Sequence, residues 1–535
     1  RGGGRCIGGQ EGRVSKHPHH RRSGATTRSG GQDMTTDTPR RYRFAAFRRA
    51  GLFGNVPPSL LITLAVGVIA GWLAVLSHAP LPLAVTPLLV CGLVAFGRLG
   101  GRPIHELLPR LVAWGLRRLL RRHRWCRPVP LIVDGVLPAP LPRALDGLEL
   151  FEVDRPWMIA GLAPGVVGVT RDRTTGTVTA VLPVSGDGQF ALADPLTQDS
   201  KVDLWGLALA GFCREGGAVT RVTWRDWTSP SGIDDHLRDV RTRWADEADS
   251  DARQSYLTLV EQVAPTSVRH EVLIELTVDP RLVRSRRRRP GQDSEAAVGV
   301  LLEEMRLFAS RLEHAGLDVG APLDAASVVE ATRVRSDPRL VDLLPTMSRS
   351  LAAAAGKAPA DFGPIAVEEH WDHIRVDGSV HRTWWFARWP RREVPAGWLD
   401  QLLFCIPATR TVTVVFEPIA PSRSDRDIDK ETVTRETNAD DRARRGFRIR
   451  AADRKAAREV TLRETELNDG FSELAYVGLL TVTAPTLDDL DDLSGIVEQT
   501  AAQAGIELHP LYARHAAGWV SSLPLGRSVA RRIGQ

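Results

Sequence analysis

Two uncharged apolar runs near the amino end decide the predicted fold. Residues 59–76 read SLLITLAVGVIAGWLAVL, and residues 81–96 read LPLAVTPLLVCGLVAF. Only four residues, SHAP at 77–80, separate them. An apolar helix needs about 20 residues to cross the hydrocarbon of a bilayer, with about 17 at the lower end. The sequence therefore predicts a transmembrane helical hairpin with helices at about 59–76 and 81–96.

Arginines on both sides of the hairpin predict its orientation. Arg48 and Arg49 precede the first run, and Arg98 and Arg102 follow the second, whereas the connecting turn has neither Lys nor Arg. By the positive-inside rule, both termini are then cytoplasmic, which predicts a multi-pass protein of the inner membrane. The basic amphipathic stretch at 104–130 is suited to lie in the lipid headgroup layer, and four of its arginines are therefore also expected to flank the membrane. These are Arg117, Arg118, Arg121 and Arg122.

Two other interpretations of the apolar runs stay open. A secretory signal peptide would match the arginine-rich flank and the Ser77-x-Ala79 pattern, but Pro80 would then be the first mature residue. A hairpin buried inside a protein core is the second alternative. The region before the hairpin, residues 1–40, predicts a disordered leader, with Met34 as the natural start of the protein.

Charge is divided unevenly along the 535-residue chain. The formal net charge is +6, but residues 1–130 hold 21 Lys and Arg against four acids, which leaves residues 131–535 with a balance of −11. A nucleic-acid binder usually carries its basic surface on the folded domain. We therefore expect no direct nucleic-acid binding by the acidic part. Five cysteines without a C-x-x-C pair also argue against a disulfide framework and a structural zinc site.

Downstream of the hairpin, strand and helix patterns alternate. Residues 165–184 predict a β-hairpin, and 424–467 predict a long charged helical segment broken near Gly446. We expect an α+β fold class: a transmembrane hairpin (41–103), the basic helix (104–130), and a cytoplasmic domain of mixed β-sheets and helices. Ferredoxin-like modules are expected in this domain, divided into subdomains at 131–290 and 291–535.

Motifs of common enzyme chemistry are missing from the sequence. It contains no G-x-x-x-x-G-K-[ST] phosphate loop, no H-E-x-x-H and no G-x-S-x-G. His370, His373 and His381 are candidate metal ligands near several carboxylates, although such a run is more often a polar helix end that leads into a hairpin. The arginines at 286–289 fit either a phosphate site or a solvated loop. We predict no catalytic residues, no metal and no cofactor.

Several short motifs, taken in order, resemble an actinobacterial family of two-helix membrane proteins named PrgI-like or EccE-like. They are RAGL at 49–52, the hairpin at 59–96, the segment 168–192 ending in GQFAL, VDLWG at 202–206, EHWD at 369–372 and LPLG at 523–526. Residues 389–421 and the charged segment after them are also similar to the N-terminal domain of type IV secretion assembly ATPases. This chain departs from that pattern because it lacks the phosphate loop.

The resemblance implies a structural, non-enzymatic subunit of a type IV-like secretion or conjugation machine. Such a subunit would contact inner-membrane lipid, bind other machine subunits including an ATPase, and be oligomeric in the assembly. A type VII secretion membrane component is the close alternative. A membrane-anchored metal-dependent hydrolase built on the three histidines, and a nucleic-acid adaptor built on residues 286–289, are the alternatives from other classes.

Overall fold

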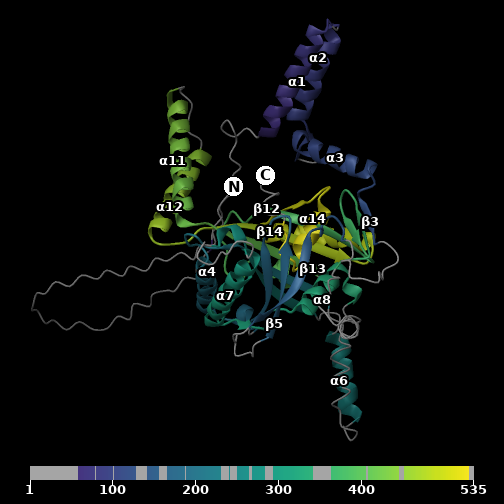
Figure 1. Ribbon diagram of the computed structural model, residues 1–535, viewed down its shortest axis with the longest axis vertical. Helices are drawn as coiled ribbons and strands as arrows, with labels where there is room; N and C mark the ends of the chain where they lie inside the picture. The colour runs from purple at the N-terminus through teal and green to yellow at the C-terminus, as the bar shows by residue number, and fades with distance from the viewer. Residues whose placement is uncertain are drawn as a thin grey trace, which may run out of the picture.

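The structure is a computed structural model in which a broad sheet carries helices on both faces and several helical projections (Figure 1). It describes residues 42, 58–78, 80–99, 102–127, 141–155, 165–186, 188–230, 240, 250–263, 268–283, 293–340, 363–404, 406, 408–444 and 451–528. The leader at 1–40, Arg48, Arg49 and the arginines at 286–289 lie outside these ranges.

The two apolar runs form two helices, α1 (Pro58–Leu76) and α2 (Leu81–Phe96). They pack against each other at Gly67, where an added Cβ would lie 2.6 Å from the Cβ of Cys91. Helix α3 (Ile104–Leu119) follows a short antiparallel pair, β1 (Arg98–Leu99) and β2 (Arg102–Pro103). Figure 1 shows α1 and α2 standing out from the sheet, with α3 lying at their base.

The predicted membrane crossing is wrong. Of the helices that the structure describes, none combines the length and apolar character that spanning a bilayer requires. Helix α2 has 16 residues, which at a rise of 1.5 Å per residue cover about 24 Å, short of a hydrocarbon layer of about 30 Å. The prediction of a multi-pass inner-membrane protein with both termini in the cytoplasm is corrected accordingly.

One 13-stranded sheet replaces the mixed sheets and ferredoxin-like modules that we expected. Every pairing between described strands is antiparallel, in the order β3-β10-β11-β12-β14-β13-β7-β8-β6-β5-β4, with β9 on β6 and β15 on β12. The fold class is thus α+β, but its architecture was predicted wrongly. The cause is the pairing of β7 with β13, which joins strands from both predicted subdomains edge to edge.

The sheet consists of two halves with the same order of elements. The first half contains β4 (Leu148–Arg155), β5 (Gly165–Asp172), β6 (Val178–Ser185), α4 (Pro195–Ala210), β7 (Val219–Pro230), α6 (Ser250–Val263), β8 (Val268–Val278), α7 (Asp293–His314), β9 (Asp318–Val319) and α8 (Ala325–Ser336). The second half contains β10 (Ala366–Glu369), β11 (Ile374–Val376), β12 (Ser379–Arg388), α10 (Asp400–Phe404), β13 (Thr409–Pro418), α11 (Pro421–Arg444), α12 (Ala451–Asn468), β14 (Leu474–Ala484), α13 (Leu487–Gln503), β15 (Glu507–Pro510) and α14 (His515–Ser522). Short 3-10 turns lie at Phe190–Leu192, Pro280–Leu282 and Pro338–Leu340.

Side-chain contacts repeat between the halves as well. Thr179 on β6 lies opposite Thr277 on β8, and Thr383 on β12 lies opposite Thr481 on β14. In both pairs the Oγ1 atoms are 3.0 Å apart. The halves are therefore related by an approximate two-fold axis between β7 and β13, as an internal repeat would produce. Sequence reasoning missed this repeat.

The two faces of the sheet are covered differently. On one face, aliphatic side chains of β6, β7, β8 and β13 pack against α4 and α7, and a second cluster packs β12, β13 and β14 against α13. The other face carries the threonine pairs and a fully buried ion pair between Arg225 and Glu275, covered by α8 and α14. A polar sheet face that would normally meet water is thus internal.

Helical arms project from equivalent places in both halves. Helix α6 is inserted between β7 and β8, and the antiparallel pair α11 and α12 is inserted between β13 and β14. In Figure 1 they extend from opposite sides of the sheet, with α11 and α12 on the same side as α1 and α2. The predicted charged helical segment is confirmed as two helices.

Candidate functional site: an apolar hairpin mounted on the sheet

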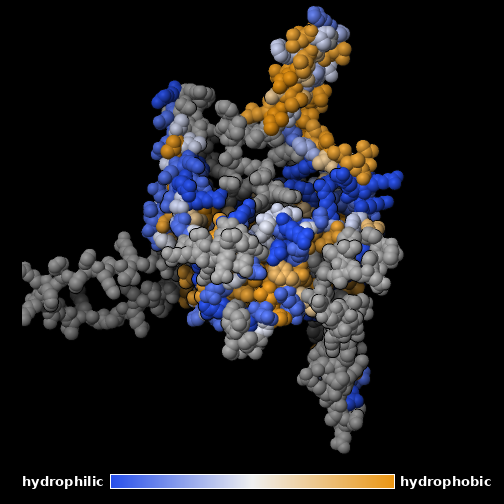
Figure 2. All heavy atoms as spheres, viewed as in Figure 1, coloured by the Kyte–Doolittle hydropathy of each residue, from blue (hydrophilic) through white to orange (hydrophobic). Residues whose placement is uncertain are grey.

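The outer surface of the α1–α2 hairpin is the largest apolar surface on the face shown in Figure 2. Sixteen large apolar side chains are exposed on it: Ile62, Val66, Val68, Ile69, Trp72, Leu73, Val75 and Leu76 on α1, and Leu81, Leu83, Val85, Leu88, Leu89, Val90, Leu93 and Phe96 on α2. Contiguous exposed apolar patches beyond a few hundred Å² mark interaction sites. The hairpin is therefore a candidate docking element.

The base of the hairpin is fixed by α3. The backbone N–H of Ile104 donates to Gly97 O at 3.0 Å, and His105 Nδ1 lies 3.1 Å from Ala95 O. Ala95 and Leu107 are both buried there. A helix at the base of the hairpin thus packs against the end of α2, so the three helices form one unit.

Helix α3 is in turn attached to the second half of the sheet. Arg117 Nη1 lies 2.9 Å from Glu369 Oε2, and the same guanidinium donates to Ala513 O. The ring of Trp114 meets Trp371 edge-on at 5.6 Å between centroids, and Trp371 stacks on Tyr512 at 5.6 Å. Burial raises the pKa of Glu369, an effect that the nearby Arg117 opposes. This contact joins the hairpin unit to the sheet.

A short strand reinforces the attachment. After α3, β3 (Arg124–Cys126) pairs with β10 and extends the sheet at its edge. Arg124 also forms an ion pair with Glu368, with Arg124 Nη2 at 2.7 Å from Glu368 Oε1. Among the described residues, the first half has no strand added outside β4. The attachment through α3 and β3 therefore distinguishes the second half from the first.

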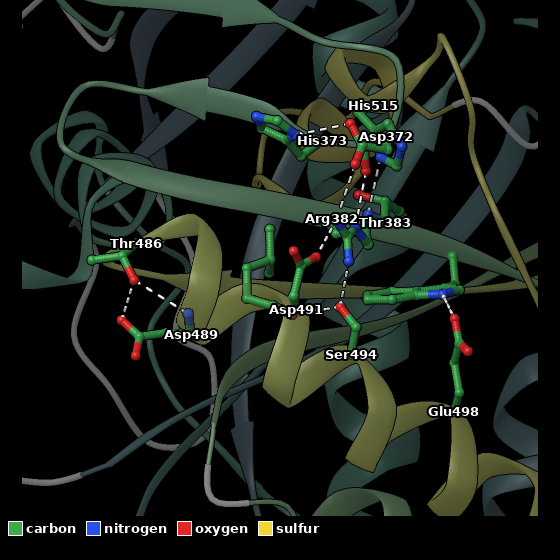
Figure 3. A network of polar contacts seen from close by, with 12 residues as sticks. Asp372, His373, Arg382, Thr383, Thr486, Asp489, Asp491, Ser494, Glu498 and His515 are labelled. Carbon is green, nitrogen blue, oxygen red and sulfur yellow. Dashed lines mark hydrogen bonds and ion pairs between the residues drawn. The ribbon is translucent and has the colours of Figure 1, made fainter.

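The turn that carries Trp371 is held by a polar network (Figure 3). His373 Nδ1 lies 3.0 Å from Asp372 Oδ1, and this contact is the main reason why the pKa of Asp372 falls to about 2. Arg382 donates from Nε to the carbonyl oxygen of Asp372 at 3.0 Å. It also reaches α13, with Nη1 2.8 Å from Ser494 Oγ and Nη2 2.8 Å from Asp491 Oδ1. The network therefore ties the α3 attachment to the second half.

The three candidate metal ligands do not converge. His370 and His373 stack with ring centroids 4.3 Å apart. His381 is completely buried elsewhere, with Nδ1 2.9 Å from Thr483 Oγ1 and Nε2 2.9 Å from Ser336 O, so both ring nitrogens are already used. Among the described residues, no group of three or more His, Cys, Asp or Glu side chains could hold a metal ion. Ring stacking and hydrogen bonds within the fold therefore account for the positions of these three histidines.

The arginines expected to flank the membrane lie instead in contacts within the protein, at exposed sites after α3, and in two short strands. Arg117 is half-buried in its ion pair with Glu369, and Arg118 places its guanidinium carbon 5.2 Å from the ring centroid of Trp114. Arg121 and Arg122 are exposed just after α3. Arg98 and Arg102 belong to β1 and β2. Sequence reasoning did not identify Trp114, Glu369 and Tyr512 as attachment residues, because their partners lie far away in the chain.

No family model matches the chain, and no curated protein matches it. The resemblance to secretion proteins therefore remains a prediction.

Proposed function

We propose that this protein is a non-catalytic assembly subunit of a secretion or conjugation-type machine. The observation that carries the proposal is the apolar hairpin mounted on the sheet by α3, since a helix that is apolar on all sides is normally buried against other helices. The protein's own sheet does not cover this surface. Another polypeptide chain would cover it in an assembly. Membrane anchoring forms no part of this proposal.

The arm formed by α11 and α12 is the proposed docking element for the ATPase of the machine. The arm carries dense charges of both signs, yet Val433 on α11 and Leu462 on α12 are exposed among them. Exposed apolar side chains surrounded by polar ones resemble the core and rim of protein interfaces. The missing phosphate loop in this chain agrees with a subunit that binds an ATPase rather than hydrolysing ATP.

Crosslinking in the native cell tests this function. The tagged full chain should capture a P-loop ATPase of a secretion system, identified by mass spectrometry. Val433→Asp together with Leu462→Asp should reduce the capture at least about tenfold, because a charge in an interface core costs more than about 1.4 kcal/mol. Leu207→Asp, at an exposed site on α4, is the matched control and should leave capture unchanged.

Absence of any P-loop ATPase from the crosslinked material would contradict the proposed function. Equal capture by the wild type and the arm variant would remove the arm from it. The identity of the captured ATPase separates a type IV-like machine from a type VII machine.

A further inference from the structure

A stacked pair of histidines lies in the turn that holds α3 on the sheet. The rings of His370 and His373 are nearly parallel, with centroids 4.3 Å apart and an angle of 11° between them. The backbone N–H of His370 donates to His373 O at 2.9 Å, which closes the turn. The same turn contains Glu369 and Trp371, through which α3 is attached. The state of the ring stack therefore bears directly on the attachment of the hairpin unit.

The stack tolerates one positive charge better than two. Two imidazolium rings at this separation repel each other, and the repulsion is stronger where the protein excludes water. Only 8% of the His373 side chain and 38% of the His370 side chain are exposed. Such a pair takes up its two protons in separate steps, the second at a lower pH than the first. A second proton is therefore favoured only when the rings move apart.

Each ring has one carboxylate beside it, and each carboxylate is already shared with an arginine. Oε1 of Glu368 lies 3.4 Å from Nε2 of His370, but it also lies 2.7 Å from Nη2 of Arg124. Asp372 contacts the other ring, and its second carboxylate oxygen is 3.3 Å from Nη2 of Arg382 (Figure 3). Neither carboxylate is thus reserved for a second imidazolium.

The other ionisable groups that the structure describes around the stack are mostly basic. They come from the segment before β3, from β11 and from the start of α14: His123, Arg375, Arg514 and His515. On α13, Asp491 is bound to Arg382. Burial and the second ring of the stack lower the pKa of His370, an effect that Glu368 and Asp372 oppose only in part. The closed turn therefore binds a proton at His370 less readily than water-exposed histidine does.

We propose that the His370–His373 stack is an acid-sensitive switch that releases α3, and with it the α1–α2 hairpin, from the sheet when both rings are protonated. In the open turn the rings are exposed to water, where a histidine binds a proton at about pH 6.5. As the pH falls below this value, the open turn gains a proton that the closed turn does not hold, so the equilibrium moves toward release. The switch regulates how the hairpin is presented, and it does not depend on the proposed function.

Hydrogen exchange of the full chain at pH 7.5 and pH 5.5 tests the switch. Protection of the α3 amides, corrected for the chemical exchange rate at each pH, should fall at the lower pH. The fall should be at least about threefold larger in the wild type than in His370→Gln, with a ceiling of about tenfold for one proton over this interval. Glutamine keeps a polar side chain in the turn but takes up no proton.

His270→Gln is the matched control variant. His270 is a partly exposed histidine on β8 that also lies beside a carboxylate, with Nδ1 3.2 Å from Asp226 Oδ1. This variant should lose α3 protection at pH 5.5 as the wild type does. Equal losses in the wild type and His370→Gln would overturn the proposal, and so would a loss in His270→Gln as small as that in His370→Gln.

Two further comparisons separate the switch from a general effect of acid. His370→Lys places a permanent charge next to the second ring, so α3 should be less protected at pH 7.5 than in His370→Gln. Equal protection in these two variants at pH 7.5 would contradict the proposal. The amides of β13 and β14 report on the body, and their protection should fall equally in the wild type and His370→Gln. If the difference between these two proteins were as large in β13 and β14 as in α3, the stack would act on the whole body and the proposal would be wrong.

Discussion

The hairpin and the sheet body use the same kind of side chain in opposite ways. Trp72 on α1 is 64% exposed, whereas Trp384 on β12 is completely buried and donates from Nε1 to Glu498 at 2.9 Å. The body buries its aliphatic and aromatic side chains between the sheet and its covering helices. The hairpin uses only one side of each helix for its own folding. Its outer surface is therefore available for contacts with other molecules, which the body's core is not.

The largest expected effect is the difference in the free energy of unfolding between alanine variants of these two tryptophans. Trp384→Ala should lower the free energy of unfolding of the body by about 3–5 kcal/mol, because it removes a buried ring and leaves a cavity. Trp72→Ala should change that quantity by less than about 0.5 kcal/mol, because the ring has no place in the body's core. Urea denaturation followed by circular dichroism measures both. Equal losses in the two variants would mean that the hairpin and the body unfold as one unit.

Acid should weaken the body and leave the hairpin intact. Burial lowers the pKa of His381 to about 4 and that of His515 to about 3, and both return to about 6.5 on unfolding. As the pH falls below 6.5, the unfolded chain binds protons that the folded chain does not, so stability is lost until the pH reaches the folded pKa values. In this range each histidine lowers the free energy of unfolding by about 1.4 kcal/mol for each pH unit of acidification. The pair together lowers it by about 2–3 kcal/mol per pH unit.

Urea midpoints at pH 7, 6 and 5 check this loss. His381→Gln should remove about half of the pH dependence, since glutamine keeps a hydrogen bond but takes up no proton in this range. Helix α1 contains no ionisable side chain, and its helicity should not change over the same interval. A flat midpoint between pH 7 and 5 in the wild type would show that the two histidines are not the neutral, buried groups described above.

The attachment between the two regions should show the smallest effect. Arg117→Ala leaves the buried carboxylate of Glu369 without its ion pair and should cost about 1–3 kcal/mol. Hydrogen exchange should then be faster in α3, while the core of the sheet keeps its protection. Adding Glu369→Gln should restore most of the loss, because it removes the unpaired charge. Arg118→Ala is the matched control, since its side chain is exposed and contacts only the ring of Trp114 among the interactions described for it.

If exchange in α3 is the same in Arg117→Ala and the wild type, the ion pair does not hold the hairpin unit to the sheet. The aromatic stack of Trp114, Trp371 and Tyr512 would then account for the attachment alone.

Local patterns in the sequence were sufficient for several elements. The apolar runs at 59–76 and 81–96 predicted α1 and α2 nearly to the residue. The β-hairpin predicted at 165–184 is present as the antiparallel pair β5 and β6. These features depend on side-chain periodicity within a few residues, which a single sequence carries directly. Apolar character alone, however, did not establish a membrane crossing.

Only the tertiary structure decided how these elements are joined. The pairing of β7 with β13 connects residues about 190 positions apart, and Arg117 meets Glu369 across 252 positions. Glu275 and Arg225 are polar residues in strands, for which the alternating pattern predicts exposure, yet α14 and the segment after it bury them by covering that face. Strand order and the second covering layer depend on long-range packing, because local preferences are compatible with many partners for each strand. The sequence by itself determined the helices and strands, and long-range packing determined the sheet, the repeat and the mount of the hairpin.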